Sequence, residues 1–220
     1  MNSMNFKAKI IVSIFSLFLM ISNLKAQNTQ SLLSEVSNKV KSYENIQIDF
    51  KYSLENTREN VKQDTKANIT LKGDNYVLNM LGVTRIFDGK TIYTIVPEDE
   101  EVTISNYSKK EDKSISVSEM LTFYENGYTY KMDIQQNIRG RKIQFIKLSP
   151  IDSNTEIKNI LLGIDMQTKH IYKLIQVDSS GTSYTITVNS FKTNQPISQN
   201  LFIFDEEKYT NQGYYINKLE

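Results

Sequence analysis

The chain contains no cysteine and no tryptophan, and His170 is its only histidine. Without cysteine it has no disulfide, no thiolate nucleophile and no thiolate metal ligand. A single histidine gives little support for a nucleophilic triad, and we interpret His170 as a surface or edge residue. Carbohydrate enzymes usually stack sugars on exposed aromatic rings, so the lack of tryptophan weighs against them. A carboxylate pair that the fold brings together remains open.

Acidic side chains cluster at two places, Glu98 to Glu101 and Asp205 to Glu207. Hard cations such as Ca²⁺ bind clustered carboxylates, but neither spacing fits a calcium-loop motif. We interpret both clusters as solvated turns. The sequence also has no glycine-rich loop of the kind that cradles phosphates. We therefore predict no catalytic residue, no metal site, no cofactor and no enzyme activity.

Charge is nearly balanced, with 26 basic and 25 acidic residues and a formal net charge of +1. There is no basic run, so nucleic acid is not an expected partner. We find no internal repeat, no linker rich in proline or glycine and no low-complexity segment. These features predict one domain over residues 27–220 and a monomer.

The N-terminus resembles a secretory signal peptide over residues 1–26. Lys7 and Lys9 precede an apolar run over residues 10–21, and Ala26 is a small residue at which cleavage could occur. The apolar run is shorter than the roughly 20 residues that span a bilayer, so a retained anchor is the weaker interpretation. We expect a soluble protein exported across the inner membrane to the periplasm.

The first part of the remaining chain combines one helix with several strands. Residues 30–43 place apolar side chains at helical spacing. Residues 46–54 alternate apolar and polar side chains without exception, which is typical of a half-buried strand. A charged loop is expected over residues 55–63. Strands follow at 65–72 and 76–80, and then a hairpin over 84–95 in which Asp88-Gly89 is expected to form a type I′ turn.

After an acidic turn that begins at Pro97, a strand is expected over residues 101–105. A capping box at 116–119 would open a short helix over 120–124. Further strands are predicted at 128–134, 142–148, 158–165, 170–178, 182–191 and 201–204. The whole pattern, about ten antiparallel strands with two helical interruptions, is typical of a mainly β fold, a barrel or curled sheet.

The order of these features resembles the periplasmic lipoprotein carrier family LolA. The shared features are the N-terminal helix, the alternating strand, the hairpin with Asp88-Gly89-Lys90-Thr91, the insert that bears a helix, the paired strands and the final Leu201-Phe-Ile-Phe204. The resemblance implies an incomplete antiparallel β-barrel that holds acyl chains beneath a helical lid. It implies a carrier that binds the acyl chains of lipoproteins and ferries them from the inner to the outer membrane. Its partners would be an inner-membrane lipoprotein exporter complex and an outer-membrane acceptor.

The residues of the implied site are apolar. The lid would present Met120, Leu121, Phe123 and Tyr124; the same residues also fit a plug that merely fills the mouth of a curled sheet. The expected lining of the acyl cavity consists of Phe50, Tyr52, Ile69, Leu71, Tyr76, Leu78, Ile86, Tyr93 and Ile95.

The sequence departs from the family pattern at two places. Better-known carriers have Arg-Pro after the second barrel strand, and that arginine holds the lid closed, whereas this chain has Gly73 at the matching position. The C-terminal segment lacks the usual Pro-x-Gly-Val ending. Three alternatives remain open: a periplasmic sensor or regulatory lipid-binding domain on the same scaffold, a lipocalin-like binder of small lipids, and an uncharacterised hydrolase.

Overall fold

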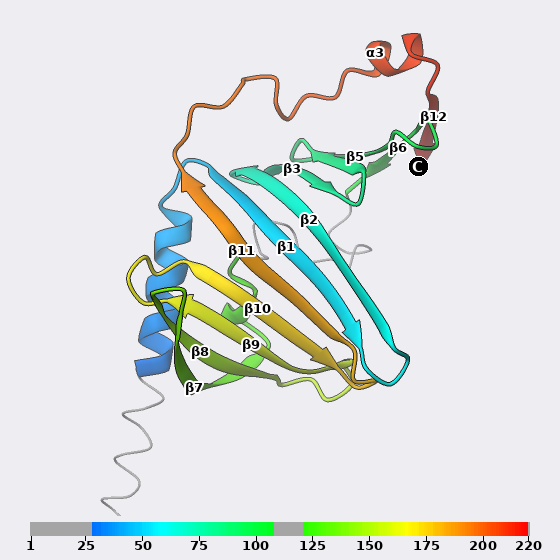
Figure 1. The fold of residues 1–220 in the computed structure, drawn as a ribbon. Coiled ribbons are helices and arrows are strands. Elements are labelled where there is room, and N and C mark those ends of the chain that lie inside the picture. Colours follow the sequence, from blue (N-terminus) through cyan, green and yellow to red (C-terminus); the bar gives the residue numbers. More distant parts are fainter. Residues whose placement is uncertain (1–27, 108–120, 220) are drawn as a thin grey trace, which may run out of the picture.

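The computed structural model describes residues 28–107 and 121–219 (Figure 1). The described residues form a mainly β structure, a 12-stranded sheet that curls without closing, with few helices. This confirms the predicted fold class. The strands are β1 (Ile46–Asn56), β2 (Val61–Lys72), β3 (Asn75–Met80), β4 (Val83–Phe87), β5 (Thr91–Val96), β6 (Glu101–Asn106), β7 (Tyr128–Ile138), β8 (Arg141–Pro150), β9 (Ile157–Asp165), β10 (Ile171–Asp178), β11 (Ser183–Thr193) and β12 (Tyr215–Leu219).

The strand order is β12-β6-β5-β4-β3-β2-β1-β11-β10-β9-β8-β7. Strand β12 runs parallel to β6, and all other neighbouring strands in this order pair antiparallel. The two edge strands of the described sheet, β12 and β7, do not pair with each other. None of the described helices is both long enough and apolar enough to cross a membrane.

A helix over residues 28–41 packs across one face of the sheet. Its apolar stripe contains Leu32, Leu33 and Val36, which are buried against residues of β8, β9 and β10. We call the sheet face that carries this helix the inner face, and the opposite one the outer face. Strand β1 follows the helix after a short turn and keeps the predicted alternation, with Ile48 buried and Lys51 exposed.

Strand register shows that the inner face is one continuous surface. Tyr52 of β1 pairs with Ile186, which pairs with Leu174, then Leu162, then Ile146 of β8. Directly paired residues point to the same face of a sheet. Leu162 and Ile146 lie in the cluster beneath the helix, so Tyr52 and Ile186 lie on the inner face as well.

Tight turns set this register. The β3–β4 loop Leu81-Gly82 and the β7–β8 loop Arg139-Gly140 have positive φ at both residues, as a type I′ turn requires. The Asp88-Gly89 hairpin is present, but only Gly89 has positive φ, at 96°, so the predicted turn type is wrong. The Asp88 carboxylate instead accepts hydrogen bonds from the backbone N–H groups of Lys90 (2.9 Å) and Thr91 (2.7 Å).

Three other predictions differ from the structure. Residues 55–63 are not all loop, because β1 extends to Asn56 and β2 begins at Val61. The described part of the predicted helix at 120–124 is a 3₁₀ turn, η1 (Phe123–Glu125). Residues 201–204 do not form a strand; they precede the short helix α3 (Glu206–Asn211) and β12. The signal peptide, the capping box and Met120 lie outside the described residues.

The C-terminal segment builds a second core on the outer face. After β11 the chain crosses to the far end of the sheet, where α3 and β12 lie next to β5 and β6 (Figure 1). Buried Phe202 packs there with the outer-face residues of β3 to β6. The rings of Tyr93, Phe204 and Tyr209 stack in series, with centroids 4.5 and 5.2 Å apart. This cover explains why both faces of these strands are apolar.

Candidate functional site

The structure divides the nine predicted lining residues between the two faces. Six lie in one inner-face cluster: Phe50, Tyr52, Ile69, Leu71, Tyr76 and Leu78. The other three, Ile86, Tyr93 and Ile95, lie on the outer face beneath the C-terminal segment. Strands buried on both faces read as continuous apolar runs, so their sequence does not show which side chains point inward.

Several inner-face residues were absent from the sequence-based set. Phe87 on β4, Ile92 on β5, and Val188 and Ile186 on β11 are among the side chains that point inward. Leu174 of β10 continues the surface toward the helix. The pairing of Phe87 with Tyr76, and of Ile186 with Tyr52, places these residues. Pairing between strands that lie far apart in the sequence cannot be read from the local pattern of residues and is known only from the fold.

The middle of the inner face is only half covered by the described residues. Tyr52, Leu54, Leu174, Tyr184 and Ile186 are each half-buried, unlike the fully buried side chains beneath the helix. Burial raises the pKa of Tyr52, and the neighbouring Tyr184 raises it further. Tyr52 therefore stays neutral at ordinary pH. These five side chains are uncharged and mostly apolar, and suit a hydrocarbon rather than an ion.

Residues 121–127, which we call the cover segment, lie against this face. Leu121 packs against both inner-face clusters and so connects them. Phe123 is half-buried, and its ring meets those of Tyr124 and Tyr128 edge-on, at centroid distances of 5.6 and 5.7 Å. Tyr124 is 1% exposed, and its burial raises the pKa of the hydroxyl. Three of the four predicted lid residues therefore lie together over the inner face; Met120 lies outside the described residues.

Glu125 fastens the cover segment to the N-terminal helix. Its carboxylate lies 2.5 Å from the ammonium of Lys41 and accepts a hydrogen bond from the hydroxyl of Ser37. Hydrogen bonds from Lys41 and then Ser37 lower the pKa of Glu125. The carboxylate of Glu125 is therefore ionised at neutral pH, and its contact with the ammonium of Lys41 is an ion pair.

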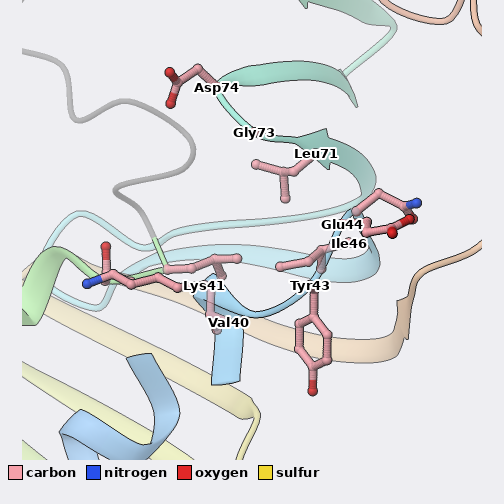
Figure 2. A pocket seen from close by; sticks show the side chains of 11 residues that line it. Val40, Lys41, Tyr43, Glu44, Ile46, Leu71, Gly73 and Asp74 are labelled. Atoms are coloured by element: carbon pink, nitrogen blue, oxygen red, sulfur yellow. The ribbon is translucent and has the colours of Figure 1, made fainter. Parts of the chain in front are cut away.

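A cavity of about 310 Å³ opens beside the other end of the cover segment (Figure 2). Figure 2 shows the end of the helix and the start of β1 on one side, and the turn between β2 and β3 on the other. Gly73, where the family resemblance places an arginine, is part of this wall. The lining residues are Val40, Lys41, Tyr43, Glu44, Asn45, Ile46, Leu71, Gly73, Asp74, Leu121 and Thr122.

The side chains of His170 and Asp205 have partners within the fold. His170, interpreted above as a surface or edge residue, is half-buried and lies just before β10; its Nε2 lies 2.9 Å from the hydroxyl oxygen of Tyr43. Glu98 to Glu100 lie in the exposed turn that leads into β6, and the half-buried Glu101 is the first residue of that strand. Asp205 caps α3 by accepting a hydrogen bond from the backbone N–H of Lys208 at 3.0 Å. Within the described ranges, no group of three or more His, Asp or Glu side chains could hold a metal ion.

Several solved structures are similar to this chain at low sequence identity. An uncharacterized conserved protein from Thermus thermophilus is 9% identical with a TM-score of 0.58; the match covers 87% of this chain and 99% of that one. A LolA superfamily protein from Nitrosomonas europaea is 13% identical with a TM-score of 0.44, covering 80% and 97%. The MucA/MucB complex of Pseudomonas aeruginosa is 13% identical with a TM-score of 0.41, covering 83% and 62%.

Sequence comparison identifies the family directly. No curated protein sequence matched the chain. The family model described as outer membrane lipoprotein carrier protein LolA matches residues 82–205, which is more than half of the 220 residues. The match begins in the turn before β4 and ends at the cap of α3. The chain belongs to the LolA family of outer membrane lipoprotein carrier proteins.

Proposed function

We propose that this protein is a periplasmic carrier, not an enzyme, that binds the acyl chains of lipoproteins and ferries them from the inner to the outer membrane. The observation that carries the proposal is the half-buried apolar surface of the inner face. It runs without a charged side chain through Tyr52, Ile186 and Leu174, and Leu121 of the cover segment packs at both of its ends. Family membership supports the same role.

A carrier of acyl chains needs enough apolar surface to offset the cost of taking a chain out of a membrane. Each CH₂ group that leaves a membrane for water costs about 0.8 kcal/mol, so a sixteen-carbon chain costs about 12 kcal/mol. Apolar side chains on alternate strand positions offset most of this cost, while the backbone hydrogen bonds of the sheet stay intact. A cover that packs on the same side chains when the site is empty limits the exposed apolar area and hence aggregation.

The proposed acyl site consists of inner-face residues and the cover. Leu121, Phe123 and Tyr124, together with Met120, would exchange contacts with the protein for contacts with acyl chains. The lining we propose is Phe50, Tyr52, Ile69, Leu71, Tyr76, Leu78, Phe87, Leu174 and Ile186.

Loading and unloading require partners with which the carrier exchanges cargo. We propose an inner-membrane exporter complex as donor, which supplies the energy of loading, and an outer-membrane acceptor. Unloading requires only higher affinity in the acceptor, because each 1.4 kcal/mol of difference biases the equilibrium about tenfold. Each carrier would act as a monomer and hold one lipoprotein.

A matched pair of variants on β11 tests acyl binding. Ile186 points inward and the adjacent Thr185, also half-buried, points outward, opposite Ser53. Ile186→Glu places a charge on the proposed site, whereas Thr185→Glu places the same charge on the other face. We expect a fluorescent sixteen-carbon fatty acid and a palmitoylated lipopeptide to bind at least about tenfold more weakly to the first variant only.

The results of these binding experiments, together with a test of lipoprotein release, distinguish a carrier from a lipocalin-like binder and from a sensor. Equal weakening by both substitutions, with both variants folded, would contradict the proposed site. Binding of the free fatty acid but not of the lipopeptide would favour a lipocalin-like binder over a lipoprotein carrier. A sensor would bind the lipopeptide without moving lipoproteins out of membranes.

A further inference from the structure

The two ends of the cover segment differ in how they are held. At its C-terminal end, Glu125 is bound by Ser37 and Lys41, Tyr124 is buried, and the backbone N–H of Ile151 donates to the carbonyl of Gly127 at 2.9 Å. At its N-terminal end, Leu121 and Thr122 line the cavity. The side chain of Thr122 makes no capping hydrogen bond to η1. The segment is thus fixed at one end and borders a void at the other.

The wall of the cavity at residues 44–46 is rigid. The side-chain amide of Asn45 donates to the carbonyl of Gln195 at 2.9 Å and accepts from its backbone N–H at 3.0 Å. The backbone N–H of Glu44 donates to the side chain of Asn194 at 2.8 Å. These bonds attach this wall to the segment that follows β11. This wall therefore has less freedom to move than the N-terminal end of the cover segment, where Thr122 makes no side-chain capping hydrogen bond.

The cavity joins solvent to the acyl site. Val40, Ile46 and Leu71 on its floor are buried members of the inner-face cluster that contains Phe50 and Tyr76. Its rim is polar and charged: Lys41, Glu44, Asn45, Asp74 and Thr122. With about 310 Å³, the cavity lies at the lower end of the roughly 300–1,000 Å³ of small-molecule sites. It suits the passage of one hydrocarbon chain whose polar end stays at the rim.

We propose that this cavity is the port through which an acyl chain enters the inner face, with Leu121 and Thr122 yielding while Glu125 holds the far end of the cover segment. The inference rests on the proposed acyl-binding function and adds the route of entry and the fixed point. An acyl chain would pass between Thr122 and the Gly73–Asp74 turn. Its ester and any attached peptide would remain among the polar groups of the rim.

Because the chain has no cysteine, a single introduced thiol can carry a bulky maleimide label. Thr122→Cys places the label at the port, and Asn154→Cys, in the exposed turn between β8 and β9, is the control. We expect the label at Thr122 to slow association of the fluorescent fatty acid about tenfold, and the label at Asn154 to change it less than about twofold. Equal rates in the two labelled proteins would overturn the port.

The fixed end is tested without a label. Glu125→Gln weakens the contacts with Ser37 and Lys41, and Asp64→Asn weakens the exposed pair with Lys51 (2.9 Å) on the outer side of β1 and β2. We expect association to become severalfold faster in Glu125→Gln alone, and the exchange Lys41→Glu with Glu125→Lys to restore the original rate. No change in Glu125→Gln would overturn the assignment of the fixed end. Absence of fatty-acid binding to the unaltered protein would instead reject the proposed function itself.

Discussion

The hydroxyl oxygen of Tyr43 lies 2.9 Å from Nε2 of His170, and this contact fixes the connection between the N-terminal helix and β1 to the residue that precedes β10. The imidazole also stacks on Phe191, with ring centroids 4.0 Å apart. Burial lowers the pKa of His170, and the charge of Lys39 lowers it further, while Asp165 acts in the opposite direction. The fold therefore favours the neutral imidazole.

This preference predicts how stability depends on pH. The contribution of neutral His170 is fully present above its ordinary pKa of 6.5 and is lost as the pH falls below 6.5 and through the lowered pKa of the folded state. Between pH 7.5 and 5.5 the free energy of unfolding should decrease more in the unaltered protein than in His170→Phe, which keeps an aromatic ring beside Phe191. Urea denaturation at both pH values measures this; identical decreases in the two proteins would contradict it.

Gly73 offers a way to close the proposed port. It lines the cavity together with Leu121 and Thr122, and a Cβ at this position would meet nothing within 4 Å. Gly73→Arg supplies a guanidinium with five donors close to the cover segment. We expect fatty-acid association to slow about tenfold, equivalent to 1.4 kcal/mol.

Gly73→Ala is the matched control, because φ at Gly73 is +56° and both substitutions bear the same backbone strain. The alanine variant should lose some stability and keep the original association rate. If stopped-flow fluorescence gives the same rate for the arginine and alanine variants, the guanidinium does not reach the cover segment.

Gly163 should matter for stability without affecting binding. A Cβ at this position would lie 2.9 Å from Cε1 of Phe145 and 3.1 Å from Cγ2 of Ile143, within an outer-face cluster. Gly163→Ala forces these packed side chains apart, which costs about 1–3 kcal/mol. Thermal unfolding should show the loss while fatty-acid affinity per folded molecule is unchanged. A comparable loss of affinity would mean that the outer-face cluster supports the acyl site.

Phe202 is the buried residue that the C-terminal segment inserts into the second core. Phe202→Ala should destabilise the protein by about 3–5 kcal/mol if the segment unfolds together with the sheet. If it opens by itself, amide hydrogen exchange should accelerate in β12 and β6 while β1 and β11 keep their protection. Unchanged exchange in β12 would show that stacking of Tyr93 on Phe204 holds the segment without Phe202.

The elements predicted best from the sequence are those marked by a pattern of neighbouring residues. The alternation over β1 identified that strand and its inner face, and the Asp88-Gly89 pair located its hairpin, although the carboxylate of Asp88 determines a different turn type. Strand β12 could not be predicted because it depends on parallel pairing with β6, far away in sequence. The sequence does not place Ile86, Tyr93 and Ile95 on the outer face, because the cover that buries them there comes from a distant segment.

Release of lipoprotein from membranes tests the central claim most directly. Spheroplasts or inner-membrane vesicles that display lipoproteins would be mixed with this protein and an energised exporter from the same organism, and the soluble fraction analysed for complexes. We expect one lipoprotein per carrier in solution, and much less release with Ile186→Glu than with Thr185→Glu. If lipoproteins stay in the membrane while the cognate exporter is active, the protein is not a lipoprotein carrier.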